Sequence, residues 1–168
     1  EDLEAGLGNL NWIEGPETVH LGTEGELRIP EGFIFLNGTD TRKFIEAIHE
    51  ISSGLEVGMV GPLDGEWFVT FDFNPLGYVP DDEKDSLDAD VILKSYQDGT
   101  EEANKEKVRR GWNNLLTVDG WTLRPTYNTT TNNLEWAINV RGSEGAAVNY
   151  ETRLLGGVAL CRSRSFAI

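Results

Sequence analysis

The residues from Gly77 to Asp90, GYVPDDEKDSLDAD, place a run of carboxylates directly after a tyrosine. Acidic residues outnumber basic ones through the following helix-like pattern as well. The acids from position 81 to 102 are Asp81, Asp82, Glu83, Asp85, Asp88, Asp90, Asp98, Glu101 and Glu102, against Lys84 and Lys94. Carboxylates held at close range either bind a cation or repel one another. Cation binding is therefore the first chemistry to consider here.

A calcium loop fits this stretch poorly. An EF-hand that began at Asp81 would need glycine at its sixth place and glutamate at its twelfth, but Ser86 and Ile92 stand there. A low-affinity divalent-ion site formed by residues 81–85 is a weaker alternative, which calorimetric titration with calcium would test. We expect no resident metal ion and no cofactor.

Three of the acids have a simpler interpretation as helix N-terminal charge. Asp85, Asp88 and Asp90 precede or begin a helical pattern, which either Ser86 or Asp88 can cap. Negative side chains near the positive end of a helix stabilise it by roughly 0.3 to 1 kcal/mol each. Asp81 and Asp82 lie further from the helix, and this explanation does not cover them.

No catalytic motif in the chain is complete. His49-Glu50 begins like the HExxH helix of zinc proteases, but Ser53 stands where the second histidine belongs. His20 is the other histidine, and Cys161, the single cysteine, has no local catalytic signature. No Gly-x-Ser-x-Gly elbow occurs. We read His49 as a helix surface residue and favour a non-enzymatic role.

Length and charge exclude several classes of protein. The chain has 168 residues, of which 39% are hydrophobic, which suits a single domain with a sizeable core. Its formal net charge of -15 would repel a phosphate backbone or an anionic membrane surface. The longest apolar runs fall far short of the roughly 20 residues that span a bilayer. We therefore expect residues 1–168 to form one soluble domain that does not bind nucleic acid.

The hydrophobic periodicity predicts an α+β fold. Period-two patterns predict strands at 18–21, 26–29, 33–36, 57–60, 67–73, 116–118, 121–123, 134–140, 147–153 and 158–160. Helical spacing predicts helices over about 40–51, 88–98 and 100–110, and residues 128–133 form a polar loop tip. This order indicates an antiparallel sheet packed with about three helices, a sandwich. Helices on both faces would make it Mog1/PsbP-like, an analogy of fold alone.

The aromatic residues favour packing over ligand binding. Trp67, Phe71 and Phe73 share one strand face by period two, which predicts core positions. A second group lies near predicted turns: Trp112, Trp121, Tyr127 and Trp136. Such residues can line a carbohydrate or peptide groove, although buried aromatics that anchor a sheet are commoner.

Short motifs follow one another along the chain: Gly15 to Gly22, Ile29 to Leu36, Gly77 to Asp82, Gly99 to Asn104, Gly120 to Tyr127, Leu134 to Ala137 and Val148 to Gly156. In this order and spacing they resemble a bacterial family of predicted membrane-anchored proteins, domain of unknown function 2167. The resemblance covers nearly the whole chain. It implies an extracytoplasmic (periplasmic) domain, anchored in the full-length protein, whose signal peptide and C-terminal anchor lie outside this sequence.

Two positions depart from the family pattern. Pro80 stands where the family usually has a lysine beside the paired acids, and Gly157 stands where an arginine often follows glycine. We therefore expect no role here that depends on either cation. The family has no established reaction, so the resemblance implies compartment and architecture without a function.

Together these observations favour a membrane-tethered extracytoplasmic module that binds a protein partner or senses an envelope component. The candidate binding residues are Tyr78, Asp81, Asp82, Trp121 and Tyr127. Membrane association is expected only through the anchor. The alternative is an envelope hydrolase that uses a carboxylate pair from the acidic 81–90 stretch, which requires carboxyl groups roughly 5 to 9.5 Å apart in a cleft.

Overall fold

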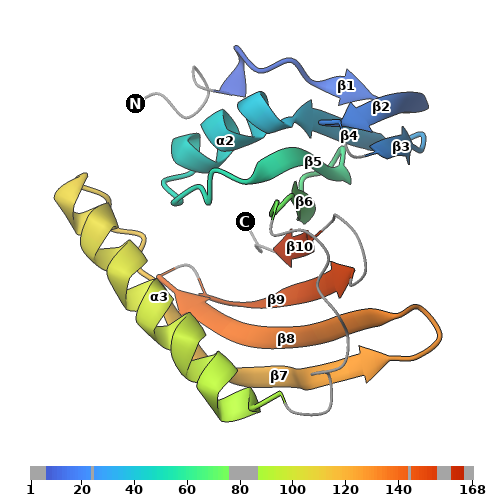
Figure 1. The fold of residues 1–168 in the computed structure, drawn as a ribbon. Helices are drawn as coiled ribbons and strands as arrows, with labels where there is room; N and C mark the ends of the chain where they lie inside the picture. Colours follow the sequence, from blue (N-terminus) through green and yellow to red (C-terminus); the bar gives the residue numbers. More distant parts are fainter. Residues whose placement is uncertain (1–6, 24, 76–86, 144, 155–159, 165–168) are drawn as a thin grey trace.

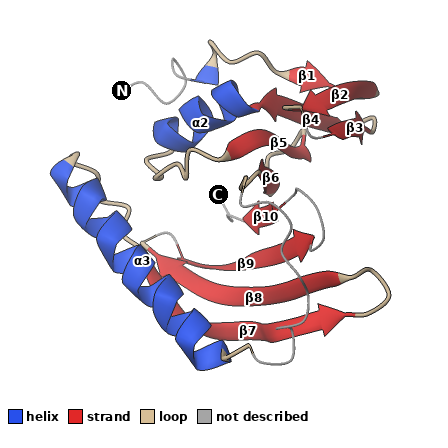
Figure 2. Ribbon diagram, viewed as in Figure 1, coloured by secondary structure: helices blue, strands red, loops and turns tan. Residues whose placement is uncertain are grey.

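A computed structural model of the chain describes residues 7–23, 25–75, 87–143, 145–154 and 160–164. The strands of its main sheet are β1 (Ile13–Glu14), β4 (Phe33–Asn37), β5 (Glu56–Pro62), β6 (Phe68–Asp72), β7 (Thr117–Asn128), β8 (Asn133–Gly142), β9 (Gly145–Leu154) and β10 (Leu160–Arg164). They lie in the order β1-β4-β5-β6-β10-β9-β8-β7 (Figure 1). A hairpin of β2 (Glu17–Leu21) and β3 (Gly25–Ile29) and two helices, α2 (Gly38–Ala47) and α3 (Ala89–Arg109), pack on this sheet (Figure 2).

Strand β10, from the end of the chain, joins the two halves of the sheet. It pairs antiparallel with residues 68–72 of β6 on one side and with residues 151–153 of β9 on the other. The strands β4 to β6 and the strands β7 to β9 are otherwise two separate antiparallel meanders. Every pairing in the main sheet is antiparallel, which confirms the predicted antiparallel α+β class.

Both described helices lie on the same face of the sheet. One row of register partners crosses the sheet by way of β10, from Leu36, Met59 and Thr70 to Glu151 and Trp136. Because register partners point to one face, Leu36 and Trp136 share a face. Helix α2 packs over the Leu36 end and α3 over the Trp136 end, while the β2–β3 hairpin covers Phe35 on the opposite face. The arrangement differs from the helices on both faces that the Mog1/PsbP-like analogy requires.

The described residues contain two helices where three were predicted, because α3 continues through Gly99. Both ends of α3 lie at residues whose local chemistry starts or stops a helix. The Asp88 carboxylate accepts hydrogen bonds from the backbone N–H groups of Asp90 and Val91. At the other end Gly111 has φ 78°, and the N–H of Trp112 donates to the carbonyl of Lys107, as in a Schellman motif. Packing on the sheet thus outweighs the roughly 1 kcal/mol cost of a mid-helix glycine.

Strand β7 is continuous where two strands were predicted. Its register against β8 shifts between Val118 and Gly120, and again on either side of Leu123. Such bulges interrupt the period of two, so one irregular strand reads in the sequence as two short ones. The predicted polar tip at 128–133 is confirmed, because β7 ends at Asn128 and β8 begins at Asn133.

The prediction that Trp67, Phe71 and Phe73 form core positions is wrong. The fully buried side of β6 carries Phe68, Thr70 and Asp72 instead. Trp67 precedes the strand, is 37% exposed and meets Phe33 edge to face. The reason is that α2 covers the Phe68 side of this strand, whereas the alternate side is only partly covered.

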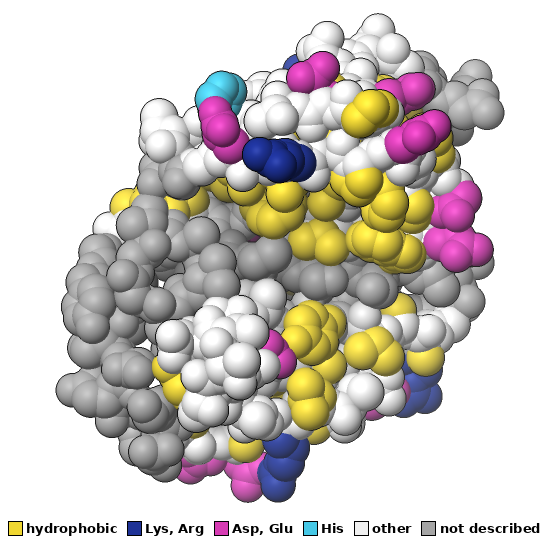
Figure 3. All heavy atoms as spheres, turned by 90° about the vertical axis from the view of Figure 1, so that its right-hand side faces the viewer, with side chains coloured by type: hydrophobic (Ala, Val, Ile, Leu, Met, Phe, Trp, Pro, Cys, Tyr) yellow, Lys and Arg dark blue, Asp and Glu magenta, His cyan; other side chains and the backbone are white. Residues whose placement is uncertain are grey.

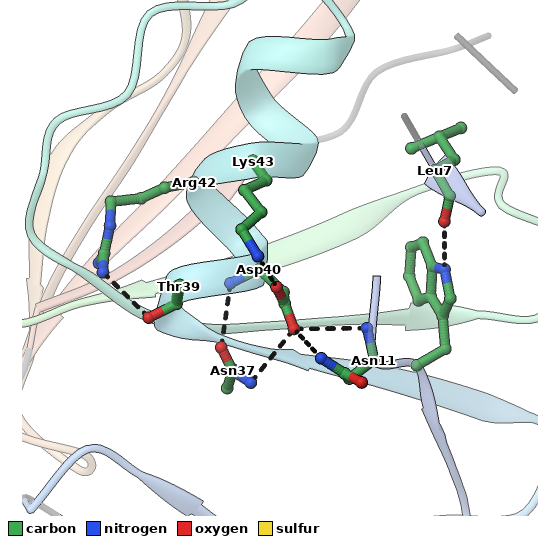
Figure 4. Close-up of polar contacts among 8 residues, drawn as sticks. Leu7, Asn11, Asn37, Thr39, Asp40, Arg42 and Lys43 are labelled. Carbon is green, nitrogen blue, oxygen red and sulfur yellow. Dashed lines mark hydrogen bonds and ion pairs between the residues drawn. The ribbon is translucent and has the colours of Figure 1, made fainter. Parts of the chain in front are cut away.

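Helix α2 begins at a buried polar cluster centred on Asp40 (Figure 4). Asn37 caps the helix by accepting a hydrogen bond from the Asp40 N–H at 3.0 Å. The Asp40 carboxylate accepts one from the Asn11 amide at 2.9 Å and one from the Lys43 ammonium at 2.8 Å. The bonds from Lys43 and then from Asn11 lower the pKa of Asp40 below its usual 3.8, although burial opposes this. The bond from Asn11 to Asp40 holds the segment before β1 against the start of α2.

Replacing Gly99 by alanine is expected to raise the free energy of unfolding by about 0.5–1 kcal/mol, because alanine favours a helix interior. A Cβ at Gly99 meets no atom within 4 Å. Gly54→Ala is the matched control, since its Cβ also meets no atom but its φ is 78°, so this variant should lose stability. Thermal unfolding measures both. A lower melting temperature for Gly99→Ala would contradict a continuous α3.

Asp40→Asn is expected to cost stability in a pH-dependent way. Since the pKa of Asp40 is lowered in the folded protein, its contribution is full well above pH 3.8 and is lost as the pH falls through the native pKa. The difference in free energy of unfolding between parent and variant should therefore shrink below pH 3.8. Urea unfolding across this range measures it, and a constant difference would contradict the assigned role.

Candidate functional site

A groove of about 680 Å³ lies between α3 and strands β7 to β9. Ile92, Tyr96 and Ala103 line it from the helix, and Trp136 and Ile138 line it from the sheet. Its volume falls within the range of about 300–1,000 Å³ that is usual for small-molecule sites. The groove is therefore the leading candidate for a functional site.

The floor of the groove changes from apolar to polar between two neighbouring strands. The helix-facing residues of β8 are Leu134, Trp136, Ile138 and Val140, all buried. Their register partners on β9 are Arg153, Glu151, Asn149 and Ala147. Since register partners share a face, the polar row of β9 lies directly beside the apolar row of β8. The resulting floor is amphipathic.

A hydrogen-bonded network crosses the groove from helix to sheet. The Trp136 indole N–H donates to the Tyr96 hydroxyl at 3.0 Å, and that hydroxyl donates to the Glu151 carboxylate. Arg153 donates to Glu151 at 3.3 Å, and its guanidinium lies 4.8 Å from the centre of the Trp136 ring. Trp136 is 2% exposed and the Glu151 side chain 6%, whereas Arg153, at the edge of the network, is 42% exposed. The network fixes the middle of α3 against β8 and β9.

Two polar atoms in the lining have unused hydrogen-bonding capacity. The side-chain oxygen of Asn149 and the Nε of Arg153 are buried, and neither has a hydrogen-bond partner within the described part of the chain. Both residues line the groove. A buried polar group without a partner costs free energy, typically about 1–3 kcal/mol. Because neither atom has accessible surface, this unmet bonding is a cost to the folded state and does not offer a contact to a ligand in the groove.

A buried ion pair closes the other end of the groove. The Lys107 ammonium lies 2.7 Å from the Glu50 carboxylate and donates to the Asn114 carbonyl at 3.0 Å. Asn114 also donates to Glu50 at 3.2 Å. Lys107 is 1% exposed. Because Glu50 follows α2 in the chain, the pair joins the two helices.

His49 is not the helix surface residue that its pattern predicted. Helix α2 ends at Ala47, and His49 lies in the following turn with φ 57°. Its ring stacks on Trp112 at 5.0 Å between centroids, and the Arg110 guanidinium also lies 5.0 Å from the Trp112 ring. The turn that bears His49 is thus held against the end of α3.

The five predicted binding residues do not form one described cluster. Tyr78, Asp81 and Asp82 lie outside the described residues, so their role stays a prediction. Trp121 packs with the core of Val118, Ile138 and Val140, and its indole nitrogen is buried without a partner among the described residues. Tyr127 donates to Asn132 at the β7–β8 turn.

The described acids of the 81–90 stretch have structural partners. Asp88 caps α3, as predicted, and Asp90 forms an ion pair with Arg124 at 2.9 Å. Asp85 and the acids before it lie outside the described residues. Within the described ranges, no group of three or more His, Cys, Asp or Glu side chains is arranged to hold a metal ion.

The groove residues Tyr96, Asn149, Glu151 and Arg153 were not assigned to a site from the sequence. A signal was present in the alternation of polar residues along β9, where Asn149, Glu151 and Arg153 recur with period two. That pattern usually marks a solvent-facing side of a strand. Only the register with β8 shows that these residues face α3.

A second surface is the face at the right of Figure 1, where hydrophobic side chains gather (Figure 3). Exposed large hydrophobic residues also occur at the β5–β6 turn, where Leu63 is 56% exposed. Such patches mark interaction sites when they are large and contiguous. None of the buried polar atoms without a partner in the described part of the chain belongs to this turn.

Comparison with known families identifies the family of the chain. The model of the family described as protein of unknown function (DUF2167) matches residues 13–162, so the chain belongs to that family. Neither the search of curated proteins nor the search of solved structures found a match. No helix in the described ranges combines the length and hydropathy that a membrane span needs.

Lys107→Met is expected to lower the free energy of unfolding by about 3–5 kcal/mol, because it leaves the Glu50 carboxylate buried without its cation. Lys105→Met is the matched control on the same helix. Lys105 is exposed and pairs with Glu102, so its loss should have a much smaller effect than the loss of Lys107. Urea unfolding compares the two. Equal effects would show that the buried pair does not hold α3 in place.

Proposed function

We propose that this member of the DUF2167 family is a non-enzymatic binding module that takes up a small amphipathic molecule of the bacterial envelope. The proposal rests on one observation, the amphipathic groove between α3 and the sheet. It offers an apolar wall for a hydrocarbon body and, beside it, the polar side chains of Asn149, Glu151 and Arg153 for a head group. Pockets that bind small molecules combine these two features.

Binding in this groove supplies a way to sense the molecule. Helix α3 forms one wall, and its C-terminal end is joined to the segment after α2 by Lys107 and Glu50. A ligand that moved α3 would therefore affect both halves of the sheet. Such coupling requires the ligand to bind one position of α3 more tightly than another.

We place the module outside the cytoplasm, in the periplasm, tethered to the membrane by an anchor. The resemblance to membrane-anchored family members supports this location. The formal net charge of -15 adds to it, because anionic lipid head groups would repel the domain and leave attachment to the anchor. A protein partner would then meet the proposed surface of Tyr78, Asp81, Asp82, Trp121 and Tyr127.

The hydrolase alternative has less support. It needs a carboxylate pair from residues 81–90, but the described acids of that stretch, Asp88 and Asp90, serve a helix cap and an ion pair. In the groove, the carboxylates of Glu50 and Glu151 each have a basic partner. The Mog1/PsbP-like analogy adds nothing to either function, since it concerns fold alone.

The uncharged dye N-phenyl-1-naphthylamine, which fluoresces strongly in apolar surroundings, tests whether the groove binds ligands. We expect its fluorescence to rise on titration with the parent protein. Ala103→Phe fills the groove from α3 and should weaken dye binding about tenfold or more, since burial of one apolar ring is worth roughly 1.5–3 kcal/mol. The measurement is a fluorescence titration at equal protein concentration.

Val108→Phe is the matched control for this experiment. Val108 lies on the same helix but is 59% exposed and does not line the groove, so this variant should bind the dye like the parent. Circular dichroism confirms that both variants keep their helix content. Equal dye binding by both variants, or no fluorescence rise with the parent, would refute the groove as a binding site.

A further inference from the structure

We infer that the ligand of this groove is an amphiphile with an anionic oxygen head group, a carboxylate or a phosphate, that binds beside Arg153. This inference rests on the proposed function and names the class of ligand. Three observations carry it: the exposure of the Arg153 guanidinium, its remaining hydrogen-bond donors, and its position at the open end of the groove.

The charge that the groove presents to a ligand is positive. Two cations and two carboxylates line it, as the pairs Lys107 with Glu50 and Arg153 with Glu151. The Arg153 side chain is 42% exposed, whereas the side chains of Lys107, Glu50 and Glu151 are 1%, 9% and 6% exposed. A molecule in the groove therefore meets the guanidinium, while both carboxylates are covered. Such a place attracts an anion and repels a cation.

The guanidinium of Arg153 has donors left for a second acceptor. Among the described residues its acceptor is Glu151, at 3.3 Å, and Glu151 also accepts from the Tyr96 hydroxyl. An arginine has five N–H donors in a planar fork. The Nε–H has no accessible surface, so contact with a ligand falls to the terminal N–H groups. Carboxylates and phosphates accept such donors in pairs.

Trp136 holds this guanidinium in position. The guanidinium lies 4.8 Å from the centre of the Trp136 ring, and the indole N–H of Trp136 is bonded to Tyr96. Stacking on an aromatic face fixes the plane of a guanidinium and leaves its edge for hydrogen bonds. An arginine that is already positioned loses less conformational freedom when it binds an anion.

Arg153 lies level with the first turn of α3. It pairs in register with Leu134 on β8, which pairs with Tyr127 on β7. Just before Tyr127 on the same strand, Arg124 forms an ion pair with Asp90 in the first turn of the helix. The register thus places Arg153 toward the N-terminal end of α3.

This end of the groove is open, and its helix side is apolar. Leu87 and Val91 line the groove there and are 38% and 64% exposed, whereas Lys107 and Glu50 at the other end are buried. An amphiphile keeps its head group partly in water and removes its hydrocarbon from it. The guanidinium and the apolar side chains at the start of α3 serve these two needs side by side.

The formal net charge of -15 opposes the approach of an anion from a distance. At physiological ionic strength the screening length is about 8 Å, so contact with the guanidinium outweighs the field of distant carboxylates. Binding is therefore measured at that ionic strength and at neutral pH.

Four probes with the same eight-carbon chain test this inference: octanoate, octyl phosphate, octylamine and octanol. Each is used below its micelle-forming concentration to displace N-phenyl-1-naphthylamine from the parent protein. We expect at least one anion to bind about three- to tenfold tighter than both octylamine and octanol, the effect of a half-exposed charge-assisted contact. The tighter anion shows whether the head group is a carboxylate or a phosphate. If neither anion binds tighter than octanol and octylamine, the inference is overturned.

Arg153→Gln adds a residue-level test. It should reduce the affinity for the anions to that for octanol and leave octanol unchanged, because the cation is lost. Arg153→Lys keeps the positive charge and should retain part of the preference. Arg141→Gln is the matched control, since Arg141 is exposed, pairs with Asp119 and does not line the groove. An equal loss for octanol and the anions would assign Arg153 a structural role and refute its contact with the head group.

The outcomes separate this inference from the proposed function. If the dye binds and all four probes displace it equally, the groove binds apolar chains, and only the head-group inference fails. If the parent protein does not bind the dye at all, the proposed function and the inference fail together. The head-group series on the parent needs no variant, so a misfolded Arg153→Gln would not leave the inference untested.

Discussion

The buried ion pair of Lys107 and Glu50 determines where α3 lies on the sheet. It joins the C-terminal end of the helix to the segment after α2, and the Tyr96 network fixes the middle of the helix against β8 and β9. Removal of either charge would leave the other buried and uncompensated, so the pair allows little variation in helix position. The groove exists because α3 is held at these points above a floor whose β9 side is polar.

The groove between α3 and the sheet is a stronger candidate for a site than the hydrophobic surface at the β5–β6 turn. The reason is that polar residues are buried in its lining. Glu151 on β9 is buried in the lining of the groove, although an apolar residue would pack there at lower cost. It accepts hydrogen bonds from the Tyr96 hydroxyl and from Arg153. A polar network in such a place suits a binding surface better than a purely structural one.

Local chemistry made much of the fold predictable, and long-range pairing made the rest unpredictable. The caps Asn37 and Asp88 and the polar tip at 128–133 are local signals, and the structure has each of them. Gly99 was misread as a break, because propensity does not include the packing of α3 on the sheet. The placement of β10 between β6 and β9 and the bond from Tyr96 to Glu151, 55 residues apart, depend on register, which periodicity does not contain.

The most direct test of the groove as a binding site is a set of intermolecular nuclear Overhauser effects between N-phenyl-1-naphthylamine and the isotope-labelled protein. We expect contacts from the rings of the dye to the methyl groups of Ile92 and Ile138, which line the groove. Contacts confined to Leu63 and Trp67, at the β5–β6 turn, would place binding on the other hydrophobic surface. That result would contradict the assignment of the α3 groove as the site.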